Sequence, residues 1–269
     1  MRIKSNISGL LRKMNLLSYA EKVRFYLQKL KYRKENDAFS TENPGIVLPP
    51  EFFIYETYRV NYKWYYEDGK KTTEEIVTLF SKYYDFSKTN NKILDWGCGP
   101  GRIVRHLPAL LPNSQVYGTD YNETYIKWCN ENLKEVIFSI NKIDPPMNFS
   151  DSFFDIIFGL SIFTHLSEKN HFDWINELHR IVKLGGGILI TTQGESYKSG
   201  LTTKEKELFD STQLVTRKYL NEGNRLYSSF QPVGFINELK RERFRVLEFI
   251  PGEIDDNEPS QDYWLLKKI

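Results

Sequence analysis

Three glycines at alternate positions, Gly97, Gly99 and Gly101, follow the short apolar segment that ends at Asp95. Because glycine has no Cβ, such a turn lets the backbone approach a ligand closely, as the first turn of nucleotide-binding α/β proteins does. Asp120 ends the next apolar segment, 19 positions after Gly101. At this sequence separation a carboxylate can accept hydrogen bonds from the two hydroxyls of a ribose. The pattern predicts a site for a cofactor that contains a ribose.

The carboxyl group of Asp95 separates the two cofactor classes that this pattern admits. The pyrophosphate of NAD would lie at the start of the following helix, where a carboxylate repels it. The glycine spacing also differs from the G-x-G-x-x-G of NAD enzymes. The methionine part of S-adenosylmethionine carries an ammonium and a sulfonium, and a carboxylate attracts both cations. The sequence therefore favours S-adenosylmethionine, and an NAD-dependent oxidoreductase is the more distant alternative.

Short apolar strands alternate with amphipathic helices from Lys92 onward, which predicts an α/β fold with a mostly parallel sheet. The last two strands should form a hairpin at the sheet edge. The expected strands are 93–95, 116–120, 136–140, 154–158, 188–191, 245–250 and 263–266. The expected helices cover about 103–111, about 125–133 and a segment that Ser167 caps and that stops at Gly185.

The first part of the chain differs from the rest in its charge. Residues 1–34 hold ten Lys and Arg against one acid, Glu21, and the other 235 residues hold 27 basic and 34 acidic groups. A basic arm on an acidic body is typical of a protein with an anionic surface partner. Ser18 is the expected cap of a helix in this arm, and Thr72 or Thr73 the expected cap of another helix that runs to about Tyr84.

Two domains follow from these patterns. Residues 1–69 form a basic helical extension with an aromatic run from Tyr58 to Tyr66, which either covers a ligand or packs between helices. Residues 70–269 form the cofactor-binding domain. Within it, residues 194–240 are an insertion with a charged helix near 203–219.

Several motifs together resemble the class I methyltransferases that depend on S-adenosylmethionine. They are Asp95-x-Gly-Cys-Gly-x-Gly, Asp120 at a strand end, Phe154-Asp-Ile-Ile, and the segment from Leu178 to Gly186. The resemblance implies a Rossmann-like fold with a mostly parallel seven-stranded sheet, an antiparallel C-terminal edge hairpin and an N-terminal helical extension. Many relatives have Lys-Pro-Gly-Gly where this chain has Lys183-Leu-Gly-Gly, a change that affects only a turn.

The resemblance also implies which residues hold the cofactor. Asp95, Gly97 and Gly99 would contact the methionine part, and Asp120 the ribose. Asn141, or a neighbour after the third strand, would lie by the adenine, and Leu160 or Ser161 would close over the cofactor. The complete expected set is Asp95, Gly97, Cys98, Gly99, Gly101, Arg102, Asp120, Tyr121, Asn141, Leu160 and Ser161.

A narrower resemblance concerns the methyl acceptor. The segments 161–166, 191–195 and 48–69 resemble a bacterial branch associated with surface polysaccharide and other glycan biosynthesis. It implies an acceptor with sugar hydroxyls, which are poor nucleophiles and need a base. His165 follows the fourth strand of the domain, where open α/β sheets bind their ligands, and is the candidate general base. The other interpretation is that His165 orders the turn before the helix capped by Ser167.

Alternatives to a glycan or small-molecule O-methyltransferase remain. The basic arm suggests a nucleic-acid or protein methyltransferase, which the acidic remainder of the chain disfavours. A protein that binds S-adenosylmethionine without catalysis fits the same motifs. The arm could equally contact an anionic membrane or a glycolipid.

Location and metal content are also constrained by composition. The sequence shows no metal-ligand grouping, and its two cysteines, Cys98 and Cys129, fit a reducing compartment. It shows neither a secretory signal nor an apolar stretch that spans a bilayer, so we expect a cytoplasmic protein.

Overall fold

The computed structural model describes residues 17–87, 90–218, 222–224, 226–256 and 258–269, and they form two compact units, divided along the chain between Thr72 and Thr73. The first unit holds the helices α2 (Leu17–Glu42) and α3 (Glu51–Thr57) and the first half of α4 (Tyr62–Ser81). Ring contacts join α2 to α3, with the Phe25 and Phe52 centroids 5.4 Å apart. No helix of the described residues is long and apolar enough to cross a membrane.

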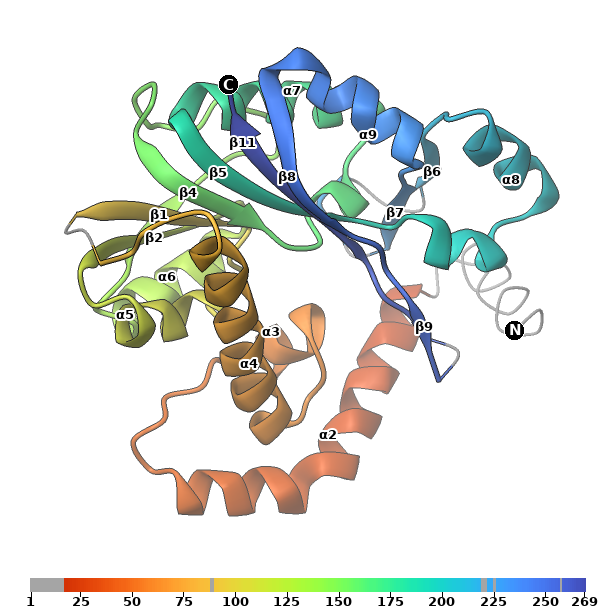
Figure 1. Ribbon diagram of the computed structural model, residues 1–269. Helices are drawn as coiled ribbons and strands as arrows, with labels where there is room; N and C mark the ends of the chain where they lie inside the picture. Colours follow the sequence, from red (N-terminus) through yellow and green to blue (C-terminus); the bar gives the residue numbers. More distant parts are fainter. Residues whose placement is uncertain (1–16, 88–89, 219–221, 225, 257) are drawn as a thin grey trace. The chain divides into compact units, whose positions relative to one another are not determined.

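The second unit is built on one seven-stranded sheet (Figure 1). Its strand order is β3-β2-β1-β4-β5-β11-β8, with parallel pairing from β3 to β5 and antiparallel pairing of β11 with both neighbours. The strands are β1 (Asn91–Trp96), β2 (Ser114–Asp120), β3 (Ile137–Ile140), β4 (Phe154–Gly159), β5 (Val182–Thr192), β8 (Phe244–Ile250) and β11 (Asp262–Lys268). The α/β fold with an antiparallel C-terminal edge hairpin, as predicted, is confirmed.

Helices cover both faces of this sheet (Figure 1). One face packs against α7 (Glu168–Ile181) and α9 (Val233–Lys240), whose buried side chains share a core with Trp96 and Ile157. The other face packs against α6 (Glu123–Asn132), α5 (Leu107–Leu110), the 3-10 helix η1 (Val104–His106) and the last turns of α4. Ser167 caps α7 by accepting a hydrogen bond from the Asn170 N–H, as predicted.

The segment between β5 and α9 carries smaller elements. They are η3 (Glu195–Gly200), α8 (Thr203–Asp210), and the antiparallel strands β6 (Val215–Lys218) and β7 (Tyr227–Phe230). The remaining short elements are η2 (Phe163–His165), which follows β4, and η4 (Arg241–Arg243), β9 (Ile254–Asp255) and β10 (Glu258–Pro259), which follow α9. The charged helix predicted near 203–219 therefore ends early, because a turn with positive φ at Thr212 leads into β6.

Two predicted helix caps in the N-terminal part are wrong. Ser18 lies inside α2. The helix expected to start at Thr72 or Thr73 begins at Tyr62, because Asn61 caps it by accepting a hydrogen bond from the Trp64 N–H at 2.9 Å. Much of the predicted aromatic run is therefore helical.

Two further predictions placed helix boundaries incorrectly around proline and glycine. The helix expected at 103–111 is only η1 and the single turn α5, because Pro108 has no N–H to continue an α-helix from Val104. The helix expected to stop at Gly185 ends at Ile181, and Gly185–Gly187 belong to β5. A Cβ on Gly187 would lie 2.9 Å from the rings of Phe80 and Tyr84, so this glycine makes room for aromatic packing.

Candidate cofactor-binding site

The glycine turn follows β1 and is held against β2. Gly97, Gly99 and Gly101 have φ angles of 77°, 55° and 80°, in the left-handed region that glycine adopts without strain. The N–H groups of Gly97 and Cys98 donate to the Thr119 carbonyl at 2.7 and 2.9 Å. The turn is therefore fixed at the carboxyl edge of the sheet, as the sequence predicts.

Asp120 ends β2 and connects this turn to the next one. Its Oδ2 accepts a hydrogen bond from the Gly99 N–H at 2.9 Å, and its Oδ1 accepts one from the Asn122 N–H at 2.8 Å. Burial raises the pKa of Asp120 to about 6, although these backbone donors lower it. The side chain is thus mostly ionised at neutral pH, and each oxygen keeps a lone pair for a ligand hydroxyl.

Asp95 is buried near the end of β1, and the described residues compensate the cost of burying its carboxyl group only in part. Only 3% of the residue is exposed, and its Oδ2 has no hydrogen-bond partner among the described residues. Burial, together with the charge of Asp120, raises the pKa of Asp95 to about 8, although Arg102 and the Val104 N–H lower it. A cationic ligand group beside Asp95 would compensate its charge, which fits the ammonium and sulfonium of S-adenosylmethionine.

A pocket at the same edge brings several predicted residues together. It is lined by Trp96, Gly97, Asp120, Tyr121, Asn141, Lys142, Ile143, Ile162, His165, Leu166, Trp174 and Gly223. The Asn141 Oδ1 in this pocket is buried and has no partner among the described residues, while its Nδ2 donates to the Lys142 carbonyl at 2.7 Å. An unpaired acceptor beyond β3 fits the exocyclic amino group of an adenine.

His165 lines this pocket with a fixed tautomer. Its Nδ1 lies 2.7 Å from the Tyr227 carbonyl oxygen, which can only accept, so we assign the proton to Nδ1. Burial lowers the pKa of His165 below its usual value, although the bond to Tyr227 raises it. The ring is therefore neutral at pH 7, and its Nε2 can accept a proton.

Ser161 follows β4 in a strained conformation with a φ of 60°. Its N–H donates to the Thr191 Oγ1 at 2.7 Å, and its Oγ donates to the Gln261 Oε1 at 3.1 Å. A Cβ on Gly97 would overlap the side chain of Ile162, the next residue. The turns after β1 and β4 are thus packed tightly together, and strain of this kind is frequent at binding sites.

Other predicted residues support the site without lining the pocket. Cys98 and Leu160 pack in the core on the α6 side of the sheet, and Gly101 makes room for the Leu133 side chain. Asp95, Gly99, Arg102 and Ser161 are also not among the lining residues. No group of three or more metal-ligating side chains occurs in the described parts of the chain.

Sequence reasoning missed Gly223, which comes from the loop between β6 and β7. Its N–H donates to the His165 carbonyl at 3.0 Å, and its own carbonyl accepts a hydrogen bond from the Tyr121 hydroxyl at 3.0 Å. A glycine in a polar loop gives no signal of which strand end it will reach. The other lining residues that were missed are Trp96, Lys142, Ile143, Ile162, Leu166 and Trp174, although Trp96, Ile162 and Leu166 lie within the quoted motifs.

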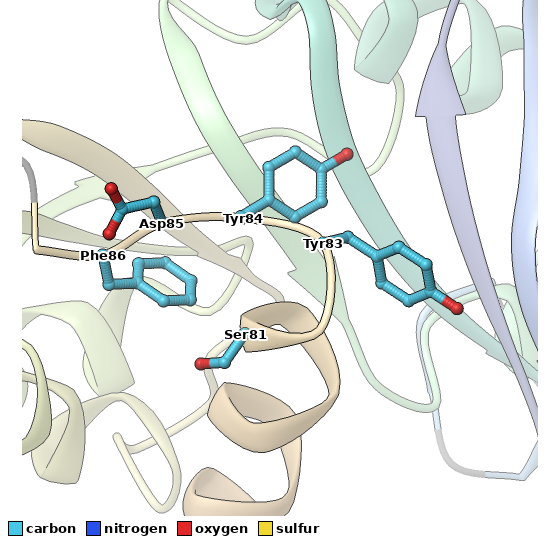
Figure 2. A pocket seen from close by; sticks show the side chains of 5 residues that line it. All are labelled: Ser81, Tyr83, Tyr84, Asp85 and Phe86. Atoms are coloured by element: carbon cyan, nitrogen blue, oxygen red, sulfur yellow. The ribbon is translucent and has the colours of Figure 1, made fainter.

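A second pocket follows α4 and is shown in Figure 2. It is lined by Ser81, Tyr83, Tyr84, Asp85 and Phe86. These residues precede β1, so they lie toward the amino ends of the parallel strands. Open α/β sheets bind ligands at the carboxyl ends, and we therefore do not place the cofactor here.

Comparisons with known proteins agree with the chemistry of the first pocket. Residues 93–186 match a family described as "Methyltransferase domain". The malonyl-[acyl-carrier protein] O-methyltransferase of Bacillus cytotoxicus is 30% identical over 139 residues, which are 49% of this chain and 45% of that protein. The Bacillus anthracis protein of the same name is 23% identical over 175 residues, 60% of this chain and 61% of that protein. The chain thus spans about half to three-fifths of these relatives.

Solved structures show the same fold. The magnesium protoporphyrin IX methyltransferase of Synechocystis has a TM-score of 0.54 at 12% identity, over 91% of this chain and all of that one. An S-adenosylmethionine-dependent methyltransferase of Mesorhizobium loti has a TM-score of 0.55 at 16% identity, over 71% of this chain and 96% of that one. None of these four names contains a glycan acceptor, so the narrower resemblance to a glycan branch gains no support from them.

Proposed function

We propose that the chain transfers a methyl group from S-adenosylmethionine to an oxygen atom of a small acceptor, and the match of residues 93–186 to a family described as "Methyltransferase domain" supports this proposal. The acceptor that fits the site best is a hydroxyl group, and a sugar hydroxyl is the form expected from the sequence. The observation that carries this choice is the neutral, oriented imidazole of His165 in the cofactor pocket.

The residues around the glycine turn bind and orient the cofactor. Asp95 compensates the cations of the methionine part, Asp120 accepts hydrogen bonds from the ribose hydroxyls, and the Asn141 Oδ1 accepts one from the adenine amino group. When bound, S-adenosylmethionine supplies an electrophilic methyl group. The turn that contains Gly97 fixes the direction in which this methyl group points, and much of the rate can come from such positioning.

His165 removes the proton of the acceptor hydroxyl. As the acceptor oxygen gained its bond to the methyl carbon, the methyl–sulfur bond would break with its electron pair left on sulfur, and the hydroxyl proton would pass to the Nε2 of His165. The Tyr227 carbonyl oxygen, which accepts a hydrogen bond from Nδ1, stabilises the resulting imidazolium. S-adenosylhomocysteine and the methyl ether are the products.

A malonyl carboxylate on an acyl carrier protein is the second candidate acceptor, and the names of the two Bacillus relatives favour it. A carboxylate is already ionised at neutral pH and needs no base. The two candidates therefore differ in their dependence on His165. A His165→Gln variant should lose activity toward a hydroxyl acceptor and retain activity toward a carboxylate.

The first experiment is a calorimetric titration of the purified chain with S-adenosylhomocysteine, with NAD, and with both ligands on an Asp95→Ala variant. Binding of S-adenosylhomocysteine that the variant loses would support the proposal and justify a screen of sugar and malonyl acceptors. Binding of NAD without binding of S-adenosylhomocysteine would overturn it. Binding without turnover of any acceptor class, nucleic acid and protein included, would indicate a non-catalytic binding protein.

A further inference from the structure

Helix α2 uses one of its faces for packing within the N-terminal unit. Along this face, Glu21 accepts a hydrogen bond from the Tyr55 hydroxyl at 3.0 Å, Phe25 contacts the Phe52 ring, and Gln28 accepts one from the Val60 N–H at 3.2 Å. Positions 21, 25, 28, 32, 36 and 39 repeat at helical spacing and are all buried or half-buried. The helix therefore already has a partner on this side.

The opposite face of α2 presents large apolar side chains to solvent. Its exposed residues, with exposed fractions, are Tyr19 (71%), Val23 (55%), Tyr26 (62%), Leu27 (61%) and Leu30 (68%). Positions 19, 23, 26, 27 and 30 share one stripe on an α-helix. We call these five residues the exposed stripe. A contiguous apolar surface of this kind, unlike a single exposed leucine, indicates an interaction site.

Cations border the exposed stripe along its whole length. On the helical wheel, Lys22, Lys29 and Arg33 lie along one border, and Arg24 and Lys31 lie beyond the other. Arg24 pairs with Glu21 at 2.7 Å and Arg33 with Asp37 at 3.9 Å, and the two arginine side chains are still 61% and 74% exposed. Glu21 is the only acid among residues 17–34 and lies on the packed face. Lys29 contacts Glu51, and its side chain is still 48% exposed. The surface is thus apolar in the centre and positively charged at its borders.

We propose that the exposed stripe of α2, from Tyr19 to Leu30, docks on an anionic lipid surface, with this part of the helix parallel to the membrane plane. An apolar stripe that enters the acyl boundary between cations that remain at the headgroups is the pattern of interfacial helices. Tyr19 and Tyr26 suit this depth because each has an apolar ring and a polar hydroxyl. The lysines and arginines select negatively charged headgroups.

The same observations disfavour two other occupants. A second copy of the chain would bring two segments of like positive charge together, which opposes self-association. A nucleic acid would contact the cations but would leave Val23, Leu27 and Leu30 facing a charged backbone. The docking surface lies entirely in the N-terminal unit, so it stands or fails separately from the methyl transfer.

The test is flotation of the full chain with lipid vesicles. Vesicles of phosphatidylcholine alone are compared with vesicles that also contain phosphatidylglycerol, at low and at high salt. We expect binding to the mixed vesicles that salt weakens. Leu27→Ser with Leu30→Ser should lower the partition coefficient by at least about tenfold through lost apolar burial. Lys22→Gln with Lys31→Gln should lower it on the order of tenfold through lost headgroup attraction.

Matched controls separate docking from general effects. Leu184→Ser with Ile254→Ser removes equally exposed apolar side chains from the second unit, and Lys127→Gln with Lys204→Gln removes exposed charges there. Both should bind vesicles like the unchanged protein. Circular dichroism and S-adenosylhomocysteine binding report whether each variant folds.

Three outcomes would overturn the proposal. They are equal binding to both vesicle types, failure to bind the mixed vesicles, and unchanged binding by both α2 variants. A dimer in light scattering that the leucine variant dissolves would instead assign the face to a second copy. Salt-sensitive binding of RNA in place of vesicles would assign it to nucleic acid.

Discussion

Asp95, the next-to-last residue of β1, and Asp120, the last residue of β2, lie on neighbouring parallel strands, and the charge of Asp120 raises the pKa of Asp95. The two side chains differ in how their burial is compensated. Asp120 accepts backbone hydrogen bonds from Gly99 and Asn122, whereas Asp95 keeps one oxygen without a partner among the described residues. Asp95 is therefore the group whose protonation a cationic ligand will change most.

Binding of the cofactor should release a proton from Asp95. With a pKa of about 8, Asp95 is mostly protonated at neutral pH in the cofactor-free protein. A bound ammonium favours the ionised form, so affinity for S-adenosylhomocysteine should rise with pH up to about 8. Calorimetry at neutral pH in two buffers of different ionisation enthalpy measures the released proton directly.

An Asp95→Asn variant tests the origin of that proton. It should bind S-adenosylhomocysteine about tenfold to a hundredfold more weakly, since a charge-assisted hydrogen bond is lost, and should release no proton. Asp255→Asn, a change at an exposed position, is the control. If the Asp95 variant released as many protons as the unchanged protein, the proton would come from another group.

Replacement of His165 should affect turnover more than cofactor binding. Without the Nε2 acceptor, kcat for a hydroxyl acceptor should fall about a hundredfold to ten-thousandfold in His165→Gln. The dissociation constant of S-adenosylhomocysteine should change little. A purely structural role would give the opposite split, with weaker cofactor binding and nearly normal kcat at saturation.

The pH profile adds a readout that packing alone does not change. In the unchanged protein the activity should fall as pH drops through the lowered pKa of His165 and the imidazole becomes protonated. At saturating S-adenosylmethionine, where the pH dependence of cofactor binding through Asp95 does not enter, this acidic limb should disappear from the residual activity of His165→Gln. His179→Gln is the matched control, because the pKa of His179 is also lowered by burial but it lies on α7 near Phe244.

The sequence predicts the site where its residues are close together along the chain. The glycine turn and Asp120 come from two consecutive strands, and parallel strands bring their carboxyl ends to one edge. Gly223 lies in an insertion about 100 positions after Tyr121, and only the folded chain shows that their backbone and hydroxyl groups meet. Contacts of this range depend on how the insertion packs, and local patterns do not contain that information.

The predicted boundaries of helices and strands were wrong where glycine has two structural uses. The first predicted domain ended at Gly69, yet this glycine lies within α4, and Gly187 lies in β5 beneath aromatic rings. A glycine ends a helix when its left-handed conformation is needed and serves packing when its missing side chain is needed. Which of these applies depends on tertiary neighbours such as Tyr84.

His171 should make the protein less stable in mild acid. It is fully buried, its Nδ1 lies 2.7 Å from the Ser167 carbonyl, and burial lowers its pKa to about 4. Since the unfolded chain binds a proton at higher pH, the stability from neutral His171 is fully present above about pH 6.5. It is lost as pH falls toward 4, with a slope of about 1.4 kcal/mol per pH unit.

Urea unfolding at several pH values measures this slope. A His171→Gln variant should be destabilised at neutral pH, and its difference from the unchanged protein should shrink toward pH 4. Asp95 has a raised pKa, so its contribution to stability falls as pH rises from its pKa in the unfolded chain to about 8, which is the opposite slope. Because Asp95 is present in both proteins, its contribution cancels in the difference. A difference that stays constant across the range would contradict the assignment to His171.

Gly223→Ala should weaken cofactor binding. Gly223 has a φ of 79°, and an added Cβ would lie 2.7 Å from the Ile143 Cδ1 and 3.2 Å from the Tyr121 ring. Both neighbours line the pocket, so the new methyl group must move them or push the loop away. We expect about tenfold weaker binding of S-adenosylhomocysteine, from strain of about 1–2 kcal/mol in the left-handed conformation. Calorimetry and fluorescence quenching both measure this change.

Two further variants show whether the loop acts through the pocket. Tyr121→Phe removes only the hydroxyl that donates to the Gly223 carbonyl, and it should weaken binding by a smaller factor in the same direction. Gly200→Ala places a methyl group where no atom lies within 4 Å, and it should bind the cofactor normally. If Gly223→Ala and Gly200→Ala bound S-adenosylhomocysteine equally well, the loop between β6 and β7 would line the pocket without affecting the affinity for the cofactor.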